Sequence, residues 1–356
     1  MADAGREWHY GADVMPAMGE YCMLSALNKK NLGLVVAGAL VLGLAACSQD
    51  SETDDASEGS GAAAPAAAPG PVFDRDPVPP SPTAQQDLLG RGEYLVEGIV
   101  GCGNCHNGRD DEGNFVEGME YAGNFVIEEA LFIAYAPNIT PDPETGIGEW
   151  TDAEIERAIR EGISRDGRVM GPPMAFPYYR EISSNDMDAI IAYLRSVPAV
   201  RNEVPLSTVR PPLPPPSWGP PVEEPIPDPP RGNTVEYGRY VAHALGHCTQ
   251  CHTPLVEGVE DFSRTGAGMN PFPAPFGYEW TAIAANITSH PTEGLGAWTD
   301  DEIKRAIVYG ISQDGRELLP FMGFSFYERI SDEDLEAIVT YLRSLPPSTA
   351  ELPSAE

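Results

Sequence analysis

The sequence contains the pentapeptide Cys102-Gly103-Asn104-Cys105-His106, and the same Cys-x-x-Cys-His pattern returns at residues 248–252. The segments ahead of the two pentapeptides also match, since Gly92-Glu93-Tyr94 corresponds to Gly238-Arg239-Tyr240. Further matches follow: Asn-Ile-Thr at 138–140 and 286–288, Trp-Thr-Asp at 150–152 and 298–300, Asp-Gly-Arg at 166–168 and 314–316, and Tyr-Leu-Arg-Ser at 193–196 and 341–344. Internal similarity over this length predicts two copies of one domain, each organised around its pentapeptide.

Cys-x-x-Cys-His is the attachment pattern for c-type haem. Two thiols three positions apart can form thioether bonds to the two vinyl groups of a porphyrin, and the adjoining histidine then reaches the iron. A zinc site would need further ligands at suitable spacing, but the remaining cysteines, Cys22 and Cys47, lie far upstream. A thioredoxin-like dithiol would need a βαβ context, which neither copy has. We predict two covalently bound haem c groups, attached at Cys102, Cys105, Cys248 and Cys251 and ligated by His106 and His252.

A methionine in each copy is a candidate for the second axial ligand. Met174 follows Gly171-Pro172-Pro173, and Met322 follows Leu319-Pro320-Phe321 at the equivalent position. Proline stiffens a loop that must cross the distal face of the haem, and a thioether ligand closes the coordination sphere and raises the reduction potential. The alternative is a methionine that fills the core. Because the two methionines match, the ligand interpretation is favoured; Met170 is set aside because its counterpart is Leu318.

Other candidate residues near the motifs have weaker patterns. Arg168 and Arg316 could pair with haem propionates, since a guanidinium matches a carboxylate, but they could equally be solvated turn residues after Asp-Gly. His243 and His247 match Glu97 and Gly101 of the first copy. Without histidine counterparts, we interpret them as surface or packing residues.

Each copy has the pattern of three helices, which predicts an all-α fold. The first helix leads into the haem motif over 88–101 and 235–246. The second begins with a capping box, Thr-x-x-Glu, at Thr151 and Thr299, and ends near Gly162 or Gly310. The third starts at residues 183 and 331 and has apolar residues at the i, i+3, i+4, i+7 spacing of an amphipathic helix.

The N-terminal region resembles an export signal. Lys29 and Lys30 precede an apolar run over 32–44, which is followed by Ala45-Ala46-Cys47. The run is too short to span a bilayer as a helix. Leu-Ala-Ala-Cys resembles a lipobox, which predicts lipidation of Cys47 and a location at the periplasmic face of a bacterial membrane. The alternative is an ordinary signal peptide that is cut near Ala46. Residues 1–22 fit no part of a signal, so Met23 is the expected start.

These patterns give a domain plan. We expect a leader over 1–46 and a lipid-anchored tether over 47–83, whose Ser, Asp, Glu, Ala and Pro predict disorder. The first domain covers 84–200 and the second 232–347, and a C-terminal tail covers 348–356. Between the domains, residues 201–231 are crowded with proline, which predicts a semi-rigid linker that runs along both domains.

The charge of the chain restricts its partners. The formal net charge is −32 at pH 7 and the pI is about 4.3. A surface this acidic repels nucleic acid and anionic headgroups. Solubility or adaptation to salt explains the charge more simply than steering of a basic redox partner, because no acidic run is confined to one domain. The four motif cysteines leave no free thiol in the folded domains, which suits an oxidising compartment.

Together, Cys-x-x-Cys-His, Asn-Ile-Thr, Trp-Thr-Asp, Asp-Gly-Arg, the methionine and the final Tyr-Leu-Arg-Ser helix resemble the class I cytochrome c fold. The chain is similar to the membrane-associated cytochrome c subunits of periplasmic alcohol, aldehyde and sugar dehydrogenases. The resemblance implies thioethers at the four cysteines, proximal His106 and His252, and distal Met174 and Met322. Many such subunits have three haem domains, whereas this sequence has two motifs. Pro137 corresponds to Ala285, so the two haem environments should differ.

We expect an electron-transfer protein rather than a catalyst, which takes electrons from a periplasmic dehydrogenase or respiratory donor and passes them to an oxidase or a soluble cytochrome. The alternative is a dihaem redox enzyme of the peroxidase or thiosulfate-oxidising type. A peroxidase needs an open distal face with acid–base residues, and no further cysteine is placed for thiosulfate chemistry. A haem-based sensor would need an output domain, which the sequence lacks.

Overall fold

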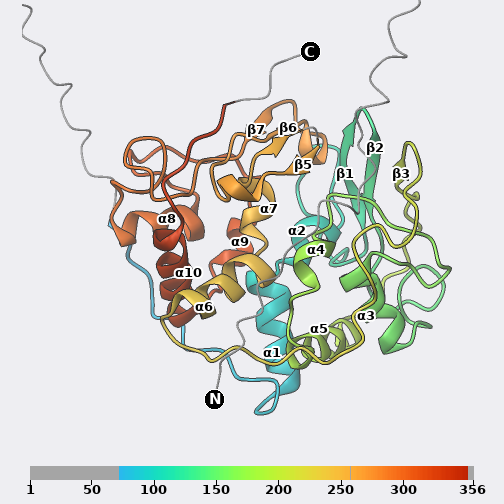
Figure 1. Cartoon of the computed structure of the whole chain (residues 1–356). Coiled ribbons are helices and arrows are strands. Elements are labelled where there is room, and N and C mark those ends of the chain that lie inside the picture. Colours follow the sequence, from blue (N-terminus) through green and yellow to red (C-terminus); the bar gives the residue numbers. More distant parts are fainter. Residues whose placement is uncertain (1–71, 257, 352–356) are drawn as a thin grey trace, which may run out of the picture. The chain divides into compact units, whose positions relative to one another are not determined.

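The computed structural model describes residues 72–256 and 258–351. The expected leader, Cys47 and most of the tether lie outside the described residues. Each copy contains a helix that continues into a π-helical turn, a short helix with the pentapeptide, and three further helices (Figure 1). In the first copy these are α1 (Leu88–Tyr94), η2 (Leu95–Ile99), α2 (Cys102–His106), α3 (Asp152–Glu161), α4 (Phe176–Tyr179) and α5 (Ser184–Ser196). In the second they are α6 (Val235–Arg239), η3 (Tyr240–Leu245), α7 (Cys248–His252), α8 (Asp300–Tyr309), α9 (Phe324–Tyr327) and α10 (Asp332–Ser344).

The ends of the expected helices follow their sequence signals. Thr151 and Glu154 form a capping box at the start of α3, and Thr299 and Glu302 form another at α8, so that orphan backbone donors are satisfied at both starts. Gly162 and its counterpart end these two helices in the left-handed conformation, which glycine adopts without a steric penalty.

The first and last helices of each copy cross closely. A Cβ atom on Gly92 of α1 would collide with the backbone carbonyl of Ala189 on α5, and one on Gly238 of α6 would collide with that of Ala337 on α10. Glycine at these two positions therefore lets the helix backbones touch. The buried side chains of both copies, such as Leu95, Ile190, Leu245 and Ile338, belong to one hydrophobic core.

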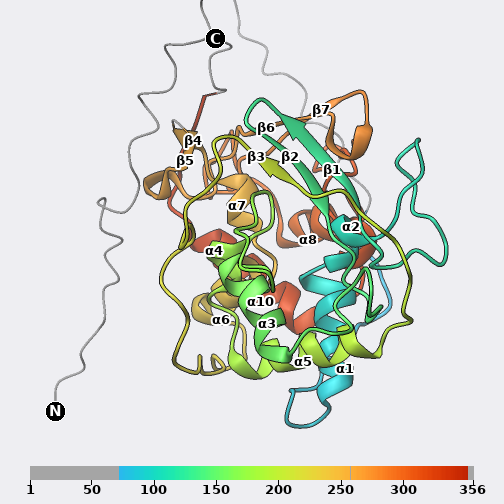
Figure 2. The same ribbon diagram turned by 90° about the vertical axis from the view of Figure 1, so that its right-hand side faces the viewer.

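The expectation of an all-α fold is wrong for the loops. An antiparallel sheet contains β1 (Asn124–Glu129), β2 (Phe132–Ala136) and β3 (Thr208–Val209), in the order β1-β2-β3 (Figure 2). The second copy has two small hairpins, β4 (Leu255–Val256) with β5 (Val259–Glu260) and β6 (Pro271–Pro273) with β7 (Thr281–Ile283). The run from 124 to 136 is rich in β-branched and aromatic residues, a composition that favours strands and is typical of a hairpin.

The segment expected to be a semi-rigid linker and the end of the expected disordered tether both have defined contacts. The proline-rich segment packs on the first copy, since Trp218 stacks on Phe176 with ring centroids 5.6 Å apart and Ile226 exchanges hydrogen bonds with Ser184. Residues 72–83, which were expected to be disordered, lie along the second copy. There Arg75 donates to the Ile330 carbonyl at 2.8 Å. The Val78 carbonyl accepts from the backbone N–H of Asp332 at the start of α10.

The two copies contact each other through reciprocal hydrogen bonds. The Tyr94 hydroxyl donates to Asp334 at 2.6 Å and accepts from the Ser331 backbone N–H at 3.1 Å. Its counterpart Tyr240 donates to Asp186 at 2.7 Å and accepts from the Ser183 backbone N–H at 3.1 Å. Each tyrosine thereby bonds to the N-terminus of the last helix in the opposite copy.

Charged pairs flank these tyrosines and are also related by the repeat. Glu97 of the first copy pairs with Arg329 of the second at 2.6 Å. Glu181 of the first copy pairs with Arg239 of the second at 2.7 Å and lies 3.6 Å from His243. Since Glu97 matches His243 and Glu181 matches Arg329, the first copy supplies the acid and the second the base in both places.

The Glu181 pair should make the contact between the copies sensitive to acid. Although burial raises the pKa of Glu181, hydrogen bonds from His243 and Arg239 lower it to about 2, from an ordinary value of 4.5. A depressed carboxyl pKa stabilises the folded protein above pH 4.5, and that contribution is lost as the pH falls towards 2. Because the side chain is one-third exposed, we expect about 1–2 kcal/mol. The denaturant midpoint is measured as the pH is lowered from about 6 to about 2. It should fall less steeply with pH for Glu181→Gln than for the parent, and an equal pH dependence would contradict this.

Candidate haem-binding sites

The two pentapeptides form equivalent short helices. Helix α2 starts after Gly101 and α7 starts after His247, and both preceding residues have the left-handed conformation, with φ of 59° and 37°. The chain therefore turns sharply from the π-helical segment into the haem motif. Within one helical turn, cysteines at i and i+3 lie on the same side, which is the arrangement that two vinyl groups of one porphyrin require. All four cysteines are partly exposed and none is in a disulfide.

The histidine of each motif has a defined orientation. The Nδ1 atom of His106 lies 2.8 Å from the Pro137 carbonyl oxygen, and that of His252 lies 2.6 Å from the Ala285 carbonyl oxygen. A carbonyl oxygen only accepts, so Nδ1 carries the proton and Nε2 presents its lone pair. This backbone contact fixes the tautomer of a metal-ligating histidine. Both side chains are only 8 % exposed, and burial lowers the pKa of each, which favours the neutral imidazole that binds iron.

The thiols do not resemble those of a redox dithiol. Burial raises the pKa of Cys102 and Cys251 to about 12 and that of Cys105 and Cys248 to about 11. A catalytic dithiol has the opposite property, a lowered thiol pKa. Within residues 72–256 and 258–351, no three His, Cys, Asp or Glu side chains are grouped to hold a metal ion. The local chemistry therefore fits covalent haem attachment.

The candidate methionines lie on loops before α4 and α9. Both side chains are partly buried, and Met174 borders the core together with Cys102 and Cys248. The residue before each methionine accepts a hydrogen bond from the other copy's haem motif: Gln250 Nε2 donates to the Pro173 carbonyl at 2.9 Å, and Asn104 Nδ2 donates to the Phe321 carbonyl at 3.2 Å. The structure thereby brings each methionine loop to the attachment helix of the opposite copy.

Two tyrosines lie close to the haem motifs. Tyr179 and Tyr327 are close enough to the motif cysteines that the pKa of each is raised, first by burial and then by the nearby thiols. Trp150 packs against the core. His247 is a packing residue, whose ring lies edge-on against Tyr179. His243 packs 4.6 Å from the Tyr178 ring and also makes the polar contacts with Glu181 and Thr249.

Arg168 borders an open cavity at the surface. With Trp150, Ser164, Arg165 and Asp166 it lines a cavity of about 460 Å³. Its Nε atom is buried without a hydrogen-bond partner and lies 3.7 Å from an Asp166 oxygen. The Nε atom of Arg157 is also buried and unbonded. Because Arg168 already pairs with Asp166 and the residues lining the cavity belong to neither haem motif, the contact of Arg168 with a propionate stays a prediction.

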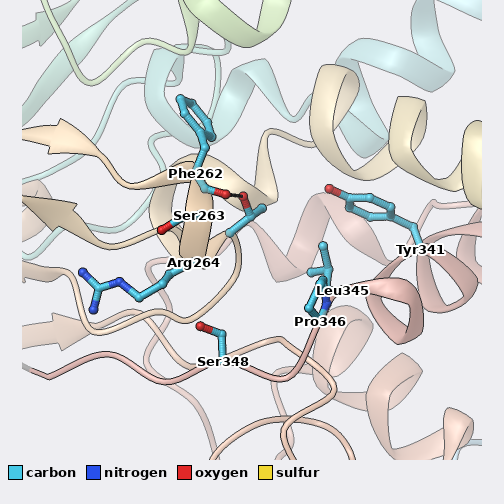
Figure 3. A pocket seen from close by; sticks show the side chains of 8 residues that line it. Phe262, Ser263, Arg264, Tyr341, Leu345, Pro346 and Ser348 are labelled. Atoms are coloured by element: carbon cyan, nitrogen blue, oxygen red, sulfur yellow. Dashed lines mark hydrogen bonds between the residues drawn. The ribbon is translucent and has the colours of Figure 1, made fainter. Parts of the chain in front are cut away.

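A second cavity, of about 220 Å³, lies between the turn after β5 and the end of α10 (Figure 3). Phe262 and Tyr341 border it, and its cationic residue Arg264 is already paired with Asp261 at 2.7 Å. This cavity therefore contributes no additional ligand chemistry to the haem motifs.

Sequence reasoning missed the contacts between the copies. Asn104 and Gln250 stand between the two cysteines of their motifs, at positions that the attachment pattern leaves open. A weak signal was present, because both residues are carboxamides at equivalent positions.

These features define a class of protein: a chain that attaches haem covalently through two thiols and ligates it with a buried histidine. The cytochrome c family model matches residues 91–198 and 235–346, one match for each copy. The chain belongs to the cytochrome c family and binds haem c.

Several relatives are named as cytochrome c subunits or as a c-type cytochrome. The chain is 32 % identical to the cytochrome c subunit of the quinone alcohol dehydrogenase of Gluconobacter oxydans, over 74 % of this chain and 56 % of that subunit. It is 30 % identical to the gluconate 2-dehydrogenase cytochrome c subunit of Pantoea cypripedii, over 74 % and 60 %. A dihaem c-type cytochrome of Cereibacter sphaeroides is 28 % identical, over 76 % of this chain and 91 % of that protein.

The chain thus spans little more than half the length of the dehydrogenase subunits that it matches. No helix within the described ranges has the length and hydrophobicity needed to cross a membrane.

Proposed function

We propose that the protein is a dihaem c-type cytochrome that carries electrons from a dehydrogenase or respiratory donor to a terminal acceptor, either an oxidase or a soluble cytochrome. The duplicated haem motif, with both histidines held by a backbone carbonyl through Nδ1, carries this proposal. Haem iron supplies reversible one-electron chemistry when bound. The residues of this chain attach the group, fix one imidazole to it and offer a thioether for its other face.

The ligand set supports transfer over catalysis. A histidine and a methionine would together fill both axial positions of each iron, and this pair is typical of cytochromes whose reduction potential is raised. We propose Met174 and Met322 as the distal ligands, since they occupy matching positions in the two copies, follow prolines in both loops and are partly buried. The dehydrogenase partner is proposed from the relatives, several of which are named as cytochrome subunits of alcohol or sugar dehydrogenases.

We also propose attachment to the periplasmic face of a bacterial membrane through a lipid on Cys47. The support is the order of basic residues, apolar run and Leu-Ala-Ala-Cys in the sequence. Intact-mass measurement of the purified protein tests it, because a lipidated N-terminus at Cys47 adds a diacylglycerol and removes the leader. A mass that retains the leader would contradict the proposal.

Haem stoichiometry gives the most direct test. A pyridine haemochrome assay should find about two haems per polypeptide in the parent. A variant with Cys248→Ala and Cys251→Ala should retain about one, and so should a variant with Cys102→Ala and Cys105→Ala. The parent should also be reduced rapidly by a quinone-dependent dehydrogenase with its substrate and reoxidised by an oxidase or soluble cytochrome. One haem in the parent, or peroxide turnover that depends on one of the two haems, would contradict the proposal.

A further inference from the structure

The haem-attachment helix of each copy touches the loop that carries the other copy's methionine. Gln250 of α7 donates Nε2 to the Pro173 carbonyl at 2.9 Å. Asn104 of α2 donates Nδ2 to the Phe321 carbonyl at 3.2 Å. Each of these carbonyls belongs to the residue directly before the methionine. The hydrogen bond therefore orients the planar peptide group that joins this residue to the methionine.

The prolines of these loops limit the number of backbone donors near each methionine. Pro172, Pro173 and Pro320 have no backbone N–H. On its C-terminal side each methionine is held within its own copy, since its carbonyl accepts from the backbone N–H of Phe176 or Phe324 at 2.9 Å. The N-terminal side of each methionine is held from the opposite copy. Gln250 therefore adds a contact from the opposite copy to the Pro173 carbonyl, and Asn104 adds one to Phe321, whose own N–H already bonds to the Leu319 carbonyl at 2.8 Å.

The packing at one of these contacts is close. A Cβ atom on Gly103 would lie 2.8 Å from the Phe326 ring, and one on Gly323 would lie 3.6 Å from the Cβ of Asn104. Arg109 donates to the backbone carbonyl of Asn104 at 2.9 Å and so anchors the residue that reaches the loop. The second copy's loop thus lies directly against the first copy's haem motif.

We propose that Gln250 and Asn104 are positioning residues, each of which holds the axial methionine of the haem in the opposite copy. This inference rests on the proposed Met174 and Met322 ligands. It makes the two centres interdependent: the strength of methionine ligation in one copy is set by the attachment helix of the other.

Displacement of the methionine by imidazole tests the proposal. Imidazole is titrated into the oxidised holoprotein, and the thioether-to-iron charge-transfer band is followed. Two backgrounds separate the haems: with Met322→Ala the remaining band reports the first haem, and with Met174→Ala it reports the second. Since one hydrogen bond contributes about 0.5–1.5 kcal/mol, Gln250→Leu in the Met322→Ala background should raise the apparent affinity for imidazole about two- to tenfold. Asn104→Leu should do the same in the Met174→Ala background.

The exchanged combinations are the matched controls. Asn104→Leu in the Met322→Ala background and Gln250→Leu in the Met174→Ala background should leave the affinity unchanged. Gln250→Asn retains a carboxamide and should lie between the parent and Gln250→Leu. If both leucine variants leave the affinity in their reporting backgrounds unchanged, or act equally in both backgrounds, the positioning role is overturned. If the parent has no thioether band, or if neither alanine background loses any of it, the proposed methionine ligation has failed instead.

Discussion

Replacement of Asp186 by alanine is expected to lower the free energy of unfolding by about 3–5 kcal/mol, because it leaves a buried arginine without its counter-charge. Arg91 is 1 % exposed and donates Nε and Nη2 to the two Asp186 oxygens, each at 2.7 Å. Burial lowers the pKa of Arg91, but the hydrogen bond and charge of Asp186 outweigh it and raise the pKa above its usual value. The variant also removes the acceptor of Tyr240 from the opposite copy. Urea denaturation of the holoprotein, followed by circular dichroism, measures the change.

Asp334→Ala is the matched control for this prediction. Asp334 occupies the equivalent position on α10, but its partners are the hydroxyls of Tyr237 and Tyr94, at 2.7 Å and 2.6 Å. Removal of the Asp334 carboxylate leaves two neutral hydroxyls without their acceptor but no buried cation, so the expected loss is about 1–3 kcal/mol. Arg91→Leu combined with Asp186→Leu should recover part of the stability lost in Asp186→Ala, since an apolar pair removes the buried charge. Equal losses for Asp186→Ala and Asp334→Ala would show that the charge of Arg91 is not responsible.

Replacement of Met174 by alanine is expected to open one haem to exogenous ligands. The thioether-to-iron charge-transfer band should fall to about half of its parent intensity, and carbon monoxide should bind to one reduced haem. The reduction potential of that haem should fall by tenths of a volt, on the order of the changes that axial ligands produce within their roughly 0.8 V range. Visible spectra, carbon monoxide titration and a spectroelectrochemical titration measure these three effects.

The second copy supplies both the parallel variant and the control. Met322→Ala should remove the other half of the band and open the other haem. Met170→Leu should change nothing in the spectrum, since Met170 corresponds to Leu318 and is not a proposed ligand. A full band with no carbon monoxide binding in both alanine variants would contradict methionine ligation, even if both haems remained attached.

The contact between the copies also explains why the repeat has diverged. Glu97 and Glu181 stand on the first copy, and their partners Arg329, Arg239 and His243 stand on the second. Two first copies would bring acids together, and two second copies would bring bases together. This arrangement favours pairing of unlike copies within one chain over pairing of like copies between chains, because the wrong pairings place like charges opposite each other.

The amino-acid sequence by itself determined the local features of this protein. The haem motif, the capping boxes at Thr151 and Thr299 and the helix-ending glycines depend on residues a few positions apart, so their geometry follows from the chain alone. The duplication was equally visible, because matched segments need no structure to be compared.

Only the tertiary structure decided how the two copies meet. Tyr94 and Asp334, or Gln250 and Pro173, are far apart in the chain, and nothing in the local pattern of either residue indicates its partner. The β1-β2 hairpin and the defined path of residues 72–83 likewise depend on surfaces that the packed helices provide. Helix starts follow from short-range hydrogen bonding, whereas contacts between copies depend on which polar groups the folded backbone brings within about 3 Å of each other.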